Sequence, residues 1–219
     1  MGKGVKQLRT VAALVGALSI LCTPVRHAVG ASSRTKTIVV LGDSVSAGFH
    51  MNPRQVYPAL LREKLRQAGL QFDVINASEV AGDTFATARA LAQLPCNLRR
   101  KIDIFIISLT GVISIDPLQA HYQNIIDQVK ACQPQARIII LGMRIPDLPG
   151  GFVIRLNQMY SELAEKNDAA LVPNMLEGVA GNPNLTIPGG LHPNAAGQKI
   201  VAQNVWRVLE PIAREVAAE

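Results

Sequence analysis

Five short apolar runs recur along this chain, and stretches with the apolar spacing of helices separate them. The runs span Thr37 to Leu41, Phe72 to Ile75, Ile102 to Leu109, Arg137 to Leu141 and Ala169 to Val172. Three of the runs are apolar at successive positions instead of alternate ones, which is typical of strands buried on both faces. Such strands alternating with helices predict an α/β fold, in which helices cover both faces of one parallel sheet.

The intervening segments have helical periodicity. Val56, Leu60, Leu61 and Leu65 fall on one helical face, and Gly69 is a suitable stop for that helix. Further helices are expected over Thr84 to Leu94, Leu118 to Ala131, Phe152 to Asn167 and Ala195 to Leu209, the last capped by Asn194. No internal repeat or linker interrupts the pattern, so residues 35–219 are predicted to form one domain of ordinary size.

The first 31 residues have the composition of an export signal. Lys3, Lys6 and Arg9 precede an apolar run from Thr10 to Leu21, and small residues follow. This run of about a dozen residues is shorter than the ~20 that a membrane-spanning helix needs. We therefore expect residues 1–31 to be a signal peptide and the mature chain to be periplasmic or secreted. An uncleaved membrane anchor is the alternative.

The net charge of +6 is concentrated in this leader and does not indicate nucleic-acid binding. Residues 1–31 hold four of the 22 basic residues and no acidic residue, which leaves 18 basic against 16 acidic residues in the remainder. The remainder also lacks a basic stripe with interleaved aromatic residues. No nucleic-acid partner is expected.

Two cysteines, Cys96 and Cys132, remain after removal of the leader. An exported chain meets oxidising surroundings, where two cysteines can form a disulfide. Each precedes an apolar run by a few residues, so both would lie at the same end of a parallel sheet. A disulfide and a pair of buried free thiols are equally compatible with this pattern. The spacing is not that of a zinc site, and no metal is expected.

Polar and glycine-rich segments follow the predicted strands, where a parallel sheet binds its ligands. They are Ser44, Gly82-Asp83, Thr110-Gly111, Met143 to Gly151 and Pro188 to Asn194. A serine in such a place suggests serine hydrolysis, which needs a hydroxyl nucleophile, an imidazole that takes its proton and donors for the oxyanion.

One of the four histidines is the best candidate for the imidazole. His27 belongs to the leader, His50 is close to Ser44 in sequence, and His121 falls in a predicted helix. His192 precedes Pro193 at the entrance to the last helix, so its position is well defined. Taken alone, a helix-entry histidine bonded to backbone is the simpler reading of this position.

Longer motifs identify a family that the chain resembles. The sequences Gly-Asp-Ser-Val-Ser-Ala-Gly from Gly42 and Gly-Leu-His-Pro-Asn-Ala-Ala-Gly from Gly190 are similar to the first and last blocks of the SGNH (GDSL) hydrolase superfamily. Val74 to Ser78 with Gly82 to Thr84 resembles the glycine block of that superfamily. Leu141 to Pro146 and Leu171 to Val179 resemble its bacterial arylesterase, thioesterase and lysophospholipase branch.

This resemblance implies a flavodoxin-like three-layer α/β/α sandwich with a five-stranded parallel sheet. It implies that Ser44 is the nucleophile and that the N–H groups of Ser44 and Gly82 bind the oxyanion. His192 would be the general base and then the acid that protonates the leaving group. It implies no cofactor, and we expect a monomer whose partner is a small ester or lipid substrate.

The chain departs from the family pattern at two positions. Val112 stands where the family carries an Asn that donates to the oxyanion, and loss of one such donor costs about 10²–10³ in rate. Gly189 stands where the family carries the Asp that orients the histidine, and loss of that function costs about 10⁴ in a related triad. Candidate substitutes are Thr110 or Ser114 for the donor, and Asp83, Asp147, Glu177 or a backbone carbonyl for the acid.

These departures leave three interpretations open. The leading one is an exported serine esterase of the arylesterase, lysophospholipase or acyl thioesterase type. The second is a pseudoenzyme that binds an ester, lipid or glycan in the same pocket, and the third is a carbohydrate deacetylase. Three apolar loop residues are candidates to line an acyl groove, with burial against the core as the alternative: Ile145, Met175 and Leu176.

Overall fold

The computed structural model describes residue 1 and residues 34–79, 92–109, 114–144, 148–190 and 192–219. The chain divides into two units, Met1–Ser33 and Arg34–Glu219. The fold and the site described below belong to the second unit.

Five parallel strands form the sheet of this unit. They are β1 (Lys36–Gly42), β2 (Phe72–Asn76), β3 (Ile104–Ser108), β4 (Arg137–Leu141) and β5 (Ala170–Val172). Their order is β2-β1-β3-β4-β5, and every neighbouring pair is parallel. The direction of winding therefore reverses between β1 and β3, which makes the carboxyl end of β1 the switch point of the sheet.

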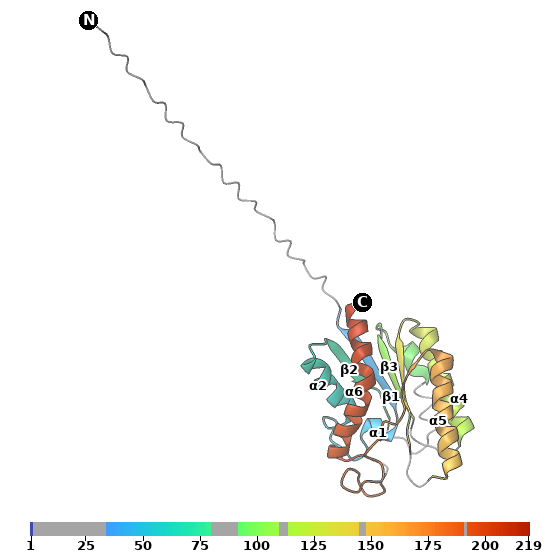
Figure 1. Cartoon of the computed structure of the whole chain (residues 1–219). Coiled ribbons are helices and arrows are strands. Elements are labelled where there is room, and N and C mark those ends of the chain that lie inside the picture. Colours follow the sequence, from blue (N-terminus) through green and yellow to red (C-terminus); the bar gives the residue numbers. More distant parts are fainter. Residues whose placement is uncertain (2–33, 80–91, 110–113, 145–147, 191) are drawn as a thin grey trace. The chain divides into compact units, whose positions relative to one another are not determined.

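Helices cover both faces of this sheet. They are α1 (Ser44–Ala47), α2 (Tyr57–Gln67), α4 (Ile115–Cys132), α5 (Gly150–Asn167) and α6 (Ala195–Ala218), and residues 92–97 are also helical. In Figure 1, α2 and α6 lie on one side of the strands and α4 and α5 on the other. The predicted three-layer sandwich with a five-stranded parallel sheet is confirmed.

The strands are continuously apolar because alternate residues enter opposite cores. Ile38 and Ile106 pack toward the core that includes residues of α2 and α6. Val39 and Phe105 pack toward the core that includes residues of α4 and α5. All four side chains are fully buried, and each contributes about 1.5–3 kcal/mol relative to an exposed side chain.

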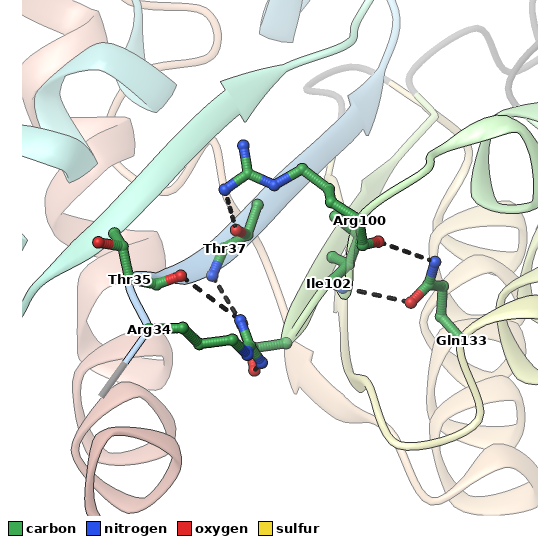
Figure 2. Close-up of polar contacts among 7 residues, drawn as sticks. Arg34, Thr35, Thr37, Arg100, Ile102 and Gln133 are labelled. Atoms are coloured by element: carbon green, nitrogen blue, oxygen red, sulfur yellow. Dashed lines mark hydrogen bonds and ion pairs between the residues drawn. The ribbon is translucent and has the colours of Figure 1, made fainter. Parts of the chain in front are cut away.

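Side chains tie the strands together at the amino-terminal edge of the sheet (Figure 2). The buried Asp103 carboxylate accepts hydrogen bonds from the guanidinium of Arg34 and, at 2.7 Å, from the N–H of Thr37. The amide of Gln133 accepts from the N–H of Ile102 and donates to the carbonyl of Arg100, both at 3.2 Å. These contacts fix the starts of β1 and β3.

A disulfide reinforces the same edge. Cys96 and Cys132 are bonded to one another, with their Cα atoms 5.0 Å apart. Cys132 is the last residue of α4, so the bridge joins the end of that helix to the segment that precedes β3. Of the two interpretations left open by the sequence, the structure has the disulfide.

The last helix extends well beyond its predicted end. The helix expected to end at Leu209 continues to Ala218 with Pro211 inside it. It continues because Ala213 and Val216 are still buried in the core shared with α2. The helix expected over Thr84 to Leu94 lies mostly outside the described residues. Within the described residues, no helix combines the length and apolar character needed to cross a membrane.

Candidate active site

Ser44 lies at the switch point of the sheet. It is the first residue of α1, which follows β1 after Asp43 alone. In open α/β sheets, ligands bind beyond the carboxyl ends of the strands at such a point. Gly42 is required there because a Cβ at this position would lie 2.4 Å from the Oγ of Ser46. The Gly-Asp-Ser sequence thus lets the strand turn tightly into α1 and places Ser44 beyond the sheet.

Polar side chains hold α1 from three neighbouring elements; those of Tyr57 and Gln198 are buried, and that of Asn76 is exposed. The Oγ of Ser46 lies 2.8 Å from the phenol oxygen of Tyr57 in α2. The amide of Asn76, at the end of β2, donates to the carbonyl of Ser46 at 2.9 Å. Gln198 in α6 donates to the carbonyl of Val45 at 3.2 Å and accepts from the N–H of Tyr57 at 2.8 Å. The turn that carries Ser44 is therefore fixed by α2, β2 and α6 together.

His192 reaches the site from the loop before α6. The N–H of Ile187 donates to the carbonyl of His192 at 2.9 Å, and the N–H of Asn194 donates to the carbonyl of Leu185 at 2.8 Å. The Asn194 side chain caps α6, as the sequence predicts. A loop closed by backbone hydrogen bonds and a capped helix therefore set the position of the imidazole.

Ser44 and His192, 148 positions apart in the sequence, meet at the strand ends. The Nε2 of His192 lies 3.0 Å from the Oγ of Ser44, and both residues are half-buried. This is the geometry for transfer of the hydroxyl proton to Nε2 of a neutral imidazole whose own proton is on Nδ1. A hydroxyl and an imidazole in this relation can carry out acyl transfer.

The surroundings keep the imidazole neutral. Burial lowers the pKa of His192 below its ordinary value, the negative charge of Asp43 opposes that shift, and the charge of His50 adds to it. An imidazole with a lowered pKa is neutral at pH 7 and available as a proton acceptor.

Among the described residues, no group of three or more His, Cys, Asp or Glu side chains is arranged to hold a metal ion.

The loop at the expected Asp position has a backbone conformation that favours glycine. Gly189 has φ +105° and Gly190 has φ +75°, a region that side chains other than glycine occupy at a cost. Gly189→Asp would thus restore the acid of the family pattern at the expense of backbone strain. Within the described parts of the chain, Ser44 is the one side chain that hydrogen bonds to His192. Glu177, one of the suggested substitutes, lies 3.8 Å from Arg207 in an exposed ion pair.

Two of the predicted groove residues belong to the core. Met175 and Leu176 are 0% and 1% exposed and pack in the core shared by α2 and α6. The N–H of Met175 donates to the carbonyl of Gly142 at 2.8 Å, and its Sδ accepts from the Oγ of Ser108 at 3.3 Å. The expectation that these side chains line an acyl groove is therefore wrong, because the chain turns inward directly after β5.

Ser114, suggested as a substitute oxyanion donor, is exposed just before α4, and the other remaining positions fall outside the described residues. The positions outside are Gly82, the expected second oxyanion donor, Ile145, the third groove candidate, and Val112, expected at the Asn position of the family. Asp83, Asp147 and Thr110, suggested as substitutes, lie outside as well.

Sequence reasoning missed two residues that support the site. Gln198 lies on the buried stripe of α6 with Val201, Ala202 and Val205, so a polar residue on an apolar stripe was an available signal. Phe49 contacts the ring of His192, with 5.1 Å between ring centroids. No local pattern marks that contact, because its two partners are far apart in the sequence.

Comparison with known proteins identifies the family. The chain matches the GDSL-like Lipase/Acylhydrolase family over residues 40–200. It is 33% identical to the esterase TesA of Pseudomonas aeruginosa over 183 residues, which cover 81% of this chain and 89% of that protein. It is 31% identical to an arylesterase of Vibrio mimicus over 186 residues, which cover 82% of this chain and 90% of that protein. A crystal structure of TesA matches it with a TM-score of 0.73 and 32% identity, covering 81% of this chain and 99% of that one.

The chain therefore belongs to the GDSL-like Lipase/Acylhydrolase family. It is a serine hydrolase of the SGNH type that acts on ester bonds.

Proposed function

We propose that the mature chain is an exported carboxylic esterase in which Ser44 forms an acyl-enzyme and His192 is the general base. The observation that carries this proposal is the 3.0 Å contact between the Oγ of Ser44 and the Nε2 of His192 at the switch point of the sheet. Export rests on the charged and apolar leader at residues 1–31.

Acylation begins when the Oγ of Ser44 attacks the ester carbonyl carbon and gives its proton to Nε2 of His192. The carbonyl electron pair moves to oxygen and produces a tetrahedral oxyanion. The N–H of Ser44 lies in the first turn of α1, where helical amides have no partner within the helix, and serves as one oxyanion donor. The N–H of Gly82 is the second donor in the family pattern.

Collapse of the oxyanion breaks the bond between the carbonyl carbon and the leaving oxygen. The leaving oxygen takes the proton from His192 and departs as an alcohol, which leaves an acyl ester on Ser44. Water then attacks the acyl ester while His192 accepts one of its protons. The second collapse returns that proton to Ser44 and releases the carboxylic acid, so the enzyme is regenerated without a net change in its protonation.

The test is hydrolysis of p-nitrophenyl acetate and butyrate by the chain without residues 1–31. Ser44→Ala and His192→Ala are expected to reduce the rate to background. Ser161→Ala is the matched control, because its Oγ is exposed on α5 and bonds to the carbonyl of Asn157 in its own helix. Intact-protein mass spectrometry of an acid-quenched reaction should show an acyl adduct that Ser44→Ala lacks. Hydrolysis at the wild-type rate by Ser44→Ala would exclude this mechanism.

A non-catalytic binding protein is the second candidate function. It is favoured by Gly189, whose left-handed φ of +105° shows a loop adapted to glycine where the family has its acid. This candidate predicts saturable binding of butyrate esters without acyl adduct or product. Ester hydrolysis that requires Ser44 would exclude this second candidate.

The relatives suggest which esters to compare. A protein of Escherichia coli that is 30% identical over 186 residues, covering 80% of this chain and 84% of its own length, is named thioesterase 1/protease 1/lysophospholipase L1. We therefore propose lysophosphatidylcholine and a fatty acyl thioester beside the aryl esters. An acetylated sugar tests the deacetylase alternative, and the substrate with the largest kcat/KM assigns the class.

A further inference from the structure

The orientation of His192 needs a second support. A contact through Nε2 alone leaves the imidazole free to tilt, and a working triad also holds the other end of the ring. Within the described residues, Ser44 is the one side chain that hydrogen bonds to His192. The position that supplies the orienting acid in the family is Gly189 here. Packing against a neighbouring ring can supply such support.

The phenyl ring of Phe49 packs against the imidazole. The two ring centroids are 5.1 Å apart and the rings are tilted by 42°, within the range in which aromatic pairs attract one another. Phe49 also contacts His50 edge-on, with centroids 4.0 Å apart. Phe49 itself is half-buried.

The same turn of backbone carries Phe49 and the nucleophile. The N–H groups of Gly48 and Phe49 both donate to the carbonyl of Ser44 at 3.0 Å, and the N–H of Met51 donates to the carbonyl of Gly48 at 2.8 Å. A shift of Phe49 relative to Ser44 would break these bonds. The backbone that carries the hydroxyl and the backbone that carries the phenyl ring are therefore fixed relative to one another.

His50, the residue directly after Phe49, has a strained backbone conformation. His50 has φ +56°, and residues other than glycine in this region are uncommon and cost of order 1–3 kcal/mol. Such strain persists only where the surrounding structure requires it. Here it bends the chain immediately after the ring that meets His192.

We propose that Phe49 is a positioning residue that holds the imidazole of His192 facing Ser44. Ring packing supplies the orientation that a carboxylate supplies in a Ser-His-Asp triad. A phenyl ring carries no charge, so it orients the imidazole without stabilising the imidazolium. This inference rests on the proposed function of the Ser44–His192 pair, and its test has a readout that does not need turnover.

Kinetics of Phe49 variants give the first readout. A misplacement of about 1 Å can cost about 10² in rate, so Phe49→Ala should lower kcat by about 10–100-fold with KM within about threefold. Phe49→Tyr keeps the ring and should restore most of the rate. Trp206→Ala, an aromatic truncation on α6 beside Lys64, controls for general destabilisation. A folded Phe49→Ala with wild-type kcat would overturn the proposal.

The second readout is the imidazole itself. In ¹⁵N-histidine NMR spectra, His192, assigned by its loss in His192→Ala, should show one neutral form protonated at Nδ1 in the wild type and in Phe49→Tyr. In Phe49→Ala, its signals should broaden or average between tautomers. Unchanged His192 signals in Phe49→Ala would contradict positioning by Phe49 even if the wild type hydrolyses no ester. Conversely, a wild-type rate of ester hydrolysis equal to that of Ser44→Ala would refute the proposed function but not the positioning of His192 by Phe49.

Discussion

Removal of the Cys96–Cys132 disulfide should destabilise the domain without changing the active site. The bridge closes a loop with a sequence separation of 36 residues. In the chain-entropy model, a loop of that length corresponds to about 4 kcal/mol of stabilisation. For a domain of this size, each kcal/mol changes the melting temperature by roughly 2–4 °C, so a decrease of roughly 8–15 °C is expected.

Thermal unfolding followed by circular dichroism measures this change. The double variant Cys96→Ala/Cys132→Ala should have a lower melting temperature than the oxidised wild type. Dithiothreitol should lower the melting temperature of the wild type and leave that of the double variant unchanged. The rate of p-nitrophenyl butyrate hydrolysis at 25 °C should be unchanged, because the bridge joins the segment before β3 to the end of α4 at the edge opposite Ser44. A double variant that melts within about 2 °C of the oxidised wild type would refute the loop-closure argument.

Two further predictions concern charge and buried hydrogen bonds. The charge of Asp43 raises the pKa of His192 and that of His50 lowers it, so Asp43→Asn should move the acid limb of kcat/KM to lower pH and His50→Asn to higher pH. Shifts in the same direction would contradict this assignment. Asp103→Ala removes the acceptor of the buried N–H of Thr37 and should cost about 1–3 kcal/mol in urea unfolding. Asp73→Ala, whose partner Arg100 is exposed, should cost less than about 1 kcal/mol.

The sheet was predictable because burial on both faces leaves a continuous apolar signal. The run from Arg137 to Leu141 matches β4 at both ends. The run from Ile102 was too long at its start, because the N–H of Ile102 bonds to the side chain of Gln133 instead of extending the strand pairing. The end of α6 was placed too early, because buried residues on the same face carry the helix onward past Pro211.

The site was predictable where residue order carried the information. Ser44 and His192 follow from motifs at the two ends of the domain, and the structure brings them together. Met175 and Leu176 were misplaced because loops have no periodicity that separates a groove residue from a core residue. The contact of Phe49 with His192 was inaccessible, because packing between segments distant in the sequence leaves no local pattern.

The site also separates two functions that one carboxylate performs in a Ser-His-Asp triad. That carboxylate orients the imidazole and stabilises its charged form. Here the charge that raises the pKa of His192 belongs to Asp43, beside the nucleophile, while the proposed orienting contact belongs to Phe49. An electrostatic effect changes the pH dependence, whereas a packing effect changes kcat at pH values where His192 is already neutral. Substitution of Asp43 should therefore act mainly on the pH profile and substitution of Phe49 on the plateau rate, a division that a single carboxylate cannot produce.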